Sequence, residues 1–274
     1  MKLSLCNEVI RELSFERQCA LAAELGYAGI ELAPFTLGED AYRMPDGERA
    51  RLRRVLADSG IAVSGLHWLL VAPKGLSITT PDKAVWQRTV DVMTALVDLC
   101  ADLGGAYLVH GSPAQRLLKG QGEGAAQRAE AAWAAIAPHA EKAGVVYCIE
   151  PLAPRETDFV NRIAEAAEIV RRIASPAVRT MLDTSAAAAG ESVPPAVLVR
   201  EWLPTGLLAH VQLNDRNRRG PGQGGDRFAP VLRALRQDGY AGWLAIEPFD
   251  YVPDGPGCAA RSIGYVQGLL EALE

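Results

Sequence analysis

Residues 145–150 read VVYCIE and residues 178–183 read VRTMLD, two short and mainly apolar runs that each end in a carboxylate. Apolar runs that do not alternate with polar residues are typical of strands buried on both faces of a parallel sheet. Eight runs of this kind recur along the chain, at intervals of roughly 30–40 residues after a shorter first interval. The other six span residues 3–6, 29–33, 61–67, 106–110, 207–213 and 243–247.

Segments with the composition and period of amphipathic helices separate these runs. Ser14 and Asp82 precede two of the segments, where an N-cap is expected. Gly60 and Gly144 stand where a helical segment ends and the next apolar run begins, which is the place of a C-cap. The clearest helical segments span residues 15–25, 83–103, 124–143, 159–173 and 227–237.

Eight strand–helix units in about 250 residues are the dimensions of a (β/α)8 TIM barrel, an α/β fold of eight parallel strands. A doubly wound open sheet is the rival fold, but it carries a glycine-rich turn after its first strand, and residues 7–10 read NEVI. No linker interrupts the chain, and the glycine-rich segment 220–225 lies within its last quarter. We therefore expect a single domain over residues 1–274.

The composition is that of an ordinary globular protein. The 274 residues carry 28 Lys and Arg against 33 Asp and Glu, a formal charge of −5, and 49% of them are hydrophobic. This acidic balance argues against a nucleic-acid partner, which selects clustered basic residues. The five cysteines are scattered, so we expect free thiols in a reducing compartment. Glu8 comes too early for a signal peptide, and no apolar run has the length of a membrane span, so we expect a cytoplasmic protein with no membrane partner.

Charged and imidazole side chains are concentrated on the predicted strands, at the end of the barrel where active sites are built. Carboxylates that meet there repel one another unless a cation joins them. Oxygen donors with one imidazole favour Mn²⁺, with Mg²⁺, Co²⁺ and Zn²⁺ as alternatives, and we expect Glu150, Asp183, His210 and Glu247 as its ligands. The residues that end the predicted strands are Glu31, His67, His110, Glu150, Asp183 and Glu247, and His210 lies within the seventh.

The order and spacing of five segments resemble the xylose-isomerase-like TIM-barrel superfamily of sugar isomerases and epimerases, in particular ketose 3-epimerases and hydroxypyruvate isomerases. The segments are CIEPL at 148–152, ETDFVN at 156–161, MLDT at 181–184, HVQLNDR at 210–216 and AIEPF at 245–249. The resemblance implies metal ligation by Glu150, Asp183, His210 and Glu247, with the two glutamates also acting as acid and base. It further implies a substrate contact for Arg216.

One position departs from the pattern of the ketose 3-epimerases. These enzymes place a histidine that contacts substrate oxygens three residues after the aspartate ligand, whereas this chain has Ala186 three residues after Asp183. The resemblance to the superfamily survives this difference. An assignment to free ketohexoses does not follow from it.

The chemistry expected of such a site is proton transfer next to a carbonyl group. A metal on the carbonyl and hydroxyl oxygens stabilises an enediolate, while Glu150 and Glu247 exchange the proton. Its return to the opposite face epimerises the carbon, and its return to the neighbouring carbon interconverts an aldose and a ketose. We expect an isomerase or epimerase of a small carbohydrate or keto-acid, with His67, His110 and Trp68 as further substrate contacts.

Three other functions remain open at this point. A metal-dependent lyase or dehydratase acting on a keto-sugar, a cyclitol or a 3-oxo-glycoside would use the same enolate and then expel a leaving group. An apurinic endonuclease shares the barrel but needs more than four histidines and a basic surface. A barrel that binds a sugar without catalysis would not need the acidic cluster. Members of the superfamily are often dimers or tetramers, so a homo-oligomer is also an expectation.

Overall fold

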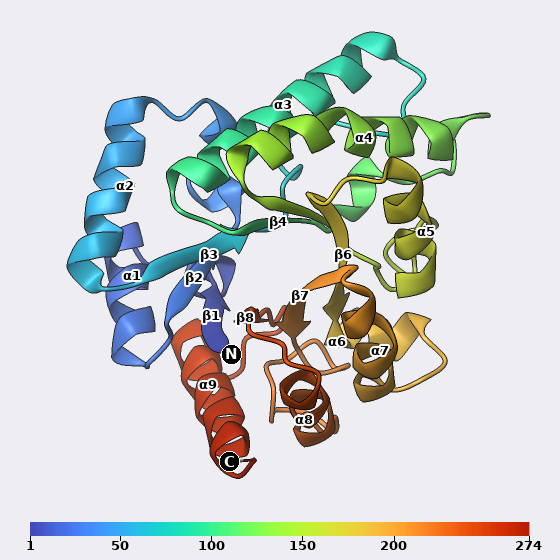
Figure 1. Ribbon diagram of the computed structural model, residues 1–274. Coiled ribbons are helices and arrows are strands. Elements are labelled where there is room, and N and C mark those ends of the chain that lie inside the picture. Colours follow the sequence, from blue (N-terminus) through green and yellow to red (C-terminus); the bar gives the residue numbers. More distant parts are fainter. Residues whose placement is uncertain (274) are drawn as a thin grey trace.

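The computed structural model describes residues 1–273, and within them eight parallel strands close into a barrel in the order of the sequence (Figure 1). The (β/α)8 prediction is confirmed. The strands are β1 Lys2–Cys6, β2 Gly29–Leu32, β3 Ala62–Leu66, β4 Tyr107–His110, β5 Val146–Ile149, β6 Val178–Asp183, β7 Leu208–Leu213 and β8 Trp243–Ile246.

Helices surround the barrel and connect its strands (Figure 1). Two of them, α6 and α7, follow one another between β6 and β7. The helices are α1 Phe15–Glu24, α2 Asp46–Ser59, α3 Lys83–Asp102, α4 Ala125–Ala143, α5 Ile163–Ile173, α6 Thr184–Gly190, α7 Pro195–Trp202, α8 Ala229–Gln237 and α9 Gly255–Glu271. Short 3-10 segments are η1 Asn7–Ile10, η2 Pro34–Thr36, η3 Ala41–Arg43, η4 Pro113–Gln115 and η5 Leu203–Thr205.

The predicted helix signals act as expected. Ser14 accepts a hydrogen bond from the backbone of Arg17, and Asp82 caps α3 in the same way. Gly60 and Gly144 end α2 and α4 in the left-handed conformation, which glycine adopts without the steric cost of a β-carbon. The boundaries differ by one or two residues except at α5, which begins at Ile163 rather than 159, because Val160 has a φ of 61°, which no helix accommodates.

Strand residues contribute to the main hydrophobic core, and polar side chains meet inside the barrel. Leu5, Ile30, Ile149 and Leu213 are among the strand residues that belong to the main hydrophobic core. Tyr107 of β4 donates a hydrogen bond to Glu31 of β2, and Gln212 of β7 donates another. These strands are not neighbours, so the contacts cross the inside of the barrel. All five cysteines are buried and free, as predicted.

Candidate active site

Three acidic residues at the C-terminal ends of the strands come together. Glu150 directly follows β5, Asp183 ends β6 and Glu247 directly follows β8. One carboxylate oxygen from each lies within 4.8 Å of the others, and all three residues are buried. The local sequence explains the placement. Each acid comes directly after buried strand residues, so the strand carries its carboxylate to the mouth of the barrel. This carboxylate trio lies at the mouth where TIM barrels build their active sites.

Asp183 is fixed on both of its oxygens, one by a backbone amide and the other by a side-chain amide. The amide N–H of Ala186 in the first turn of α6 donates to Oδ1 at 2.6 Å, so Asp183 is also the N-cap of that helix. Asn214 donates to Oδ2 at 2.7 Å and to the carbonyl oxygen of Glu247 at 2.9 Å. Asn214 therefore joins the ends of β6, β7 and β8.

Glu247 is held on one oxygen only. Its Oε1 lies 3.0 Å from Nδ1 of His67 and accepts a hydrogen bond of 3.0 Å from the indole of Trp68. Its Oε2 is buried and has no hydrogen-bond partner among residues 1–273. Trp68 has a φ of 52°, a left-handed conformation that is costly for a bulky residue and that accumulates at functional sites. Two donors from one loop thus hold Oε1 and leave Oε2 free.

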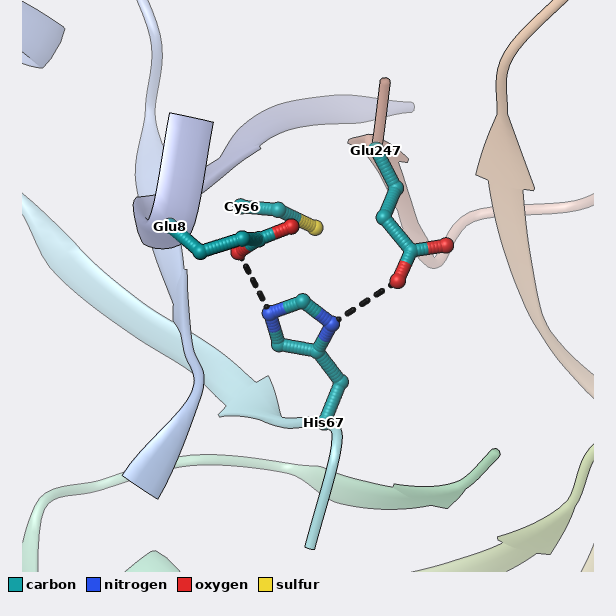
Figure 2. A group of neighbouring side chains, drawn as sticks. All are labelled: Cys6, Glu8, His67 and Glu247. Atoms are coloured by element: carbon teal, nitrogen blue, oxygen red, sulfur yellow. Dashed lines mark hydrogen bonds and ion pairs between the residues drawn. The ribbon is translucent and has the colours of Figure 1, made fainter. Parts of the chain in front are cut away.

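His67 connects Glu247 to a second acid at the start of the chain (Figure 2). Its Nε2 lies 2.9 Å from Oε2 of Glu8, which belongs to η1 directly after β1. Burial alone would lower the pKa of His67, but Glu8 and Glu247 together raise it well above its ordinary value. The two acids therefore favour the imidazolium form of His67, which is hydrogen-bonded to Glu247 through Nδ1 and ion-paired with Glu8 through Nε2.

Cys6 completes a second group of possible ligands with Glu8, His67 and Glu247. Figure 2 shows Glu8 and Glu247 on opposite flanks of the imidazole ring, with Cys6 between them. Burial and the surrounding carboxylates raise the pKa of the Cys6 thiol well above its ordinary value, so it stays protonated. Within this group His67 links Glu8 to Glu247 through two ion pairs, which makes the group a support for Glu247.

Glu150 depends on a glycine. A β-carbon placed on Gly111, at the end of β4, would lie 1.7 Å from Oε2 of Glu150, which no real structure allows. The φ of Gly111 is not in the left-handed region, so the need here is for space rather than for backbone freedom. Gly111 therefore allows the Glu150 carboxylate to reach the pocket.

The trio is electrostatically crowded without a cation. Burial, followed by repulsion from Glu247 and Asp183, raises the pKa of Glu150 well above its ordinary value. Burial also raises the pKa of Asp183 to about 6, despite the bonds from Ala186 and Asn214, and that of Glu247 to about 8, despite His67. Three buried carboxylates with raised pKa values and an unpartnered oxygen on Glu247 suit a divalent cation, which would remove the repulsion.

The structure places His210 outside the carboxylate trio. Its Nε2 lies 3.1 Å from Oε2 of Glu31, and its ring stacks on Tyr107 with centroids 3.8 Å apart. The register of β6 and β7 gives the reason, since His210 pairs with Met181, whereas Asp183 pairs with Gln212. His210 is therefore one level deeper in the barrel than the ligand position predicted for it.

Three of the four predicted substrate contacts do not line the pocket above the trio. His110 is fully buried, with its Nδ1 2.8 Å from the hydroxyl of Tyr147, and burial lowers its pKa to about 3. Arg216 does not line the pocket and forms an exposed ion pair with Asp226 at 2.6 Å. His67, as described, is fully buried between two acids. Of the four predicted contacts, Trp68 alone lines the pocket above the trio.

The pocket has further walls that the sequence analysis did not assign. Phe249 packs against Trp68, with ring centroids 6.2 Å apart, and the guanidinium of Arg218 lies 5.0 Å from the Phe249 ring. Glu156 and Ala186 also line it. Arg218 has a φ of 69°, and its carbonyl accepts hydrogen bonds from the backbone of Phe249 and Asp250. The sequence signal for Arg218 is a cluster of three arginines at positions 216, 218 and 219. The conformation of the loop places the second of them in the wall of the pocket.

A closed parallel barrel with an acidic trio at the C-terminal ends of its strands defines the class of this protein. The sequence profile of the family described as xylose isomerase-like TIM barrel matches residues 19–268, and the chain belongs to that family. No helix among residues 1–273 combines the length and hydrophobicity required to span a membrane.

Proteins with known activities resemble the chain over most of its length. The L-ribulose 3-epimerase of Mesorhizobium japonicum is 29% identical over 224 residues, which cover 79% of this chain and 72% of the relative. The D-psicose 3-epimerase of Agrobacterium fabrum is 28% identical over 237 residues, with coverage of 83% and 76%. The solved 3-keto-D-glucoside 4-epimerase of E. coli superposes with a TM-score of 0.84 at 17% identity and covers 98% of this chain and 99% of its own, which shows a shared fold.

Proposed function

We propose that this protein is a divalent-cation-dependent epimerase or isomerase of a small carbohydrate that bears a carbonyl group. The observation that carries the proposal is the convergence of Glu150, Asp183 and Glu247 within 4.8 Å in a buried pocket. The sequence relatives support it, since they are ketose 3-epimerases. A ketose 3-epimerase inverts a carbon next to the carbonyl group of its substrate. A pair of carboxylates can remove the proton from such a carbon and return it.

The carboxylate trio would hold the cation. Its oxygens are hard ligands, for which Mn²⁺ or Mg²⁺ is the first choice. When bound, the cation supplies Lewis acidity that stabilises negative charge on the carbonyl oxygen of the substrate.

Glu247 and Glu150 would move the proton. Glu247 lines the pocket, and His67 and Trp68 fix its carboxylate there through Oε1. Glu150 enters the pocket from β5, beside Gly111, and would return the proton to the substrate. Burial and neighbouring carboxylates raise the pKa of both groups, and the pKa of about 8 suits Glu247 for proton exchange near neutral pH.

The walls of the pocket would bind the sugar. Trp68 and Phe249 offer an apolar surface for the C–H face of a sugar ring, and Arg218 and Glu156 offer polar groups for its hydroxyls. Ala186 leaves space where a larger side chain would fill the pocket. This space favours a substrate with an additional substituent over a bare ketohexose.

Glu247→Gln tests the assignment. We expect turnover of L-ribulose, D-psicose, D-tagatose or a 3-keto-D-glucoside, whichever the wild type accepts, to fall roughly 10²–10⁴-fold. Glu24→Gln, an exposed change on α1, is the matched control and should leave turnover unchanged. Full activity in a folded Glu247→Gln protein would overturn the acid–base role of Glu247.

A further inference from the structure

Glu8 is a buried carboxylate without a hydrogen bond. Its side chain is 7% exposed, and neither of its oxygens accepts a hydrogen bond from residues 1–273. Nε2 of His67 lies 2.9 Å from Oε2, but the two atoms are not aligned as a hydrogen bond, and Nε2 has no other acceptor within the same residues. Buried charges in proteins are hydrogen-bonded, paired or bound to a metal. Glu8 does not line the pocket above the trio, so a substrate in that pocket would not supply the missing partner.

The other ring nitrogen of His67 is already oriented by an acid. Nδ1 lies 3.0 Å from Oε1 of Glu247, and this contact turns Nε2 toward Glu8 (Figure 2). A histidine that binds a metal through one nitrogen almost always donates the N–H of its other nitrogen to a carboxylate, a carbonyl or water. Two ligand atoms about 2.1 Å from a cation, bound at a right angle, lie roughly 3 Å apart. Nε2 and Oε2 of Glu8 therefore have the spacing of two neighbouring ligands of one cation.

Cys6 supplies a third ligand atom. It ends β1, two residues before Glu8, and is fully buried. Ligand atoms of Cys6, Glu8, His67 and Glu247 all lie within 4.8 Å of one another. The carboxylate trio offers oxygen alone, whereas this group adds a sulfur and a nitrogen. The two groups therefore suit different cations.

We infer that Cys6, Glu8 and His67 bind a second divalent cation, and that the chemistry of these ligands selects Zn²⁺. Thiolate, imidazole and carboxylate are the ligands of Zn²⁺, for which Co²⁺ can substitute, whereas Mn²⁺ and Mg²⁺ prefer the oxygens of the trio. On binding, the thiol proton and the proton on Nε2 pass to solvent. The ligands come from the ends of β1 and β3, and none of them lines the pocket, so the inference does not depend on the proposed function.

Binding of Co²⁺ to purified protein stripped with EDTA tests the site without a substrate. Bound Co²⁺ should give a thiolate charge-transfer band in the near ultraviolet, which an oxygen site does not produce. Zn²⁺ should displace it, and Mn²⁺ should leave the band in place. Cys6→Ala should remove the band, whereas Cys19→Ala, which removes another buried thiol on α1, should keep it.

Glu8→Gln tests the carboxylate ligand. It should keep the thiolate band but weaken Co²⁺ binding at least roughly tenfold, because loss of even an outer partner of a ligand costs roughly 10- to 100-fold in affinity. Glu24→Gln, an exposed change on α1, should leave the affinity unaltered.

Three results would overturn the inference and leave the proposed function intact. They are bound Co²⁺ without a thiolate band in the wild type, a band that persists in Cys6→Ala, and unchanged Co²⁺ affinity in Glu8→Gln. If Cys6→Ala does not fold, the affinity of Glu8→Gln still decides the question. Failure of the proposed function is seen separately, as Mn²⁺-loaded protein that shows the thiolate band with Co²⁺ but turns over none of the sugars.

Discussion

Nδ1 of His67 lies 3.0 Å from Oε1 of Glu247, although the two residues are 180 positions apart in the chain. The barrel brings β3 and β8 to the same mouth, and Glu8 holds the other side of the imidazole. The result is a fixed carboxylate with one oxygen bound and one available. The predictions below follow from this arrangement and from the crowding around it.

Loss of the indole donor should impair the reaction more than binding. Trp68→Phe keeps the aromatic wall but removes the hydrogen bond to Oε1 of Glu247. We expect kcat to fall roughly tenfold, as for the loss of about 1.5 kcal/mol from a bond to a charged group, with a smaller change in KM. Trp86→Phe is the control, since it removes an indole bond to the carbonyl of Arg128 far from the trio. Equal effects of the two substitutions on kcat would contradict a positioning role for Trp68.

A single methyl group at Gly111 should displace Glu150. In Gly111→Ala the new carbon would overlap Oε2 of Glu150, so the carboxylate must move by an ångström or more. A shift of this size costs roughly 100-fold in rate. Gly264→Ala on α9 meets no atom within 4 Å and should keep full activity. Steady-state kinetics with a thermal unfolding curve for each variant separate a lost carboxylate position from a lost fold.

Arg218 and Arg216 should differ in their effect on substrate affinity. Arg218 lines the pocket, whereas Arg216 is paired with Asp226 at the surface. Asn is compatible with the left-handed backbone at position 218, so Arg218→Asn removes the guanidinium group without straining the loop. We expect KM to rise roughly tenfold, as for the loss of a charged hydrogen bond. The same change at position 216 should leave KM unaltered. A larger effect at Arg216 would restore the contact that the sequence motif implied.

Stability should fall as the pH rises when the cation is absent. The folded pKa values of Asp183, about 6, and Glu247, about 8, lie above their ordinary values of 3.8 and 4.5. Between about pH 4 and pH 8 these two carboxyl groups together bind more protons in the folded protein than in the unfolded chain, which outweighs the single proton that His110, with its pKa lowered to about 3, loses on folding below about pH 6.5. The free energy of unfolding of the protein must therefore decrease with pH over that window.

Urea unfolding at pH 5 and pH 8 in EDTA measures this decrease. Saturating Mn²⁺ binds the deprotonated trio and should stabilise the protein most at pH 8, which reduces or reverses the slope. Equal slopes with EDTA and with Mn²⁺ would mean that the cation does not bind to these carboxylates.

The trio was predictable because a single rule places it. Glu150, Asp183 and Glu247 each end an apolar run, and the ends of parallel strands meet at one mouth. His210 stands three residues before the end of its run, so the same rule places it deeper in the barrel. The register of β6 and β7 makes Gln212, and not His210, the β7 residue that is level with Asp183. The sequence alone does not provide that register.

The contacts between loops that are distant in the chain could not be predicted from the sequence. Glu8 was seen only as an early charged residue, yet it supports His67 from across the barrel. Gly111 was unremarked because its importance depends on the path of a side chain from the next strand. That Arg218 and not Arg216 lines the pocket depends on the conformation of one loop. In this loop Asp226 forms an ion pair with Arg216, and the backbone at Arg218 is left-handed.

Exchange of hydrogen for deuterium from solvent tests the central claim most directly. The Mn²⁺-loaded protein is incubated in D₂O with L-ribulose, D-psicose, D-tagatose and a 3-keto-D-glucoside, and the carbon-bound protons are followed by NMR. We predict deuterium at one carbon next to the carbonyl of at least one compound, with an intact skeleton, and no exchange in Glu247→Gln or after EDTA. Exchange that persists in Glu247→Gln or without a cation would contradict proton transfer by the carboxylate trio, and expulsion of a hydroxyl or aglycone would show a lyase instead.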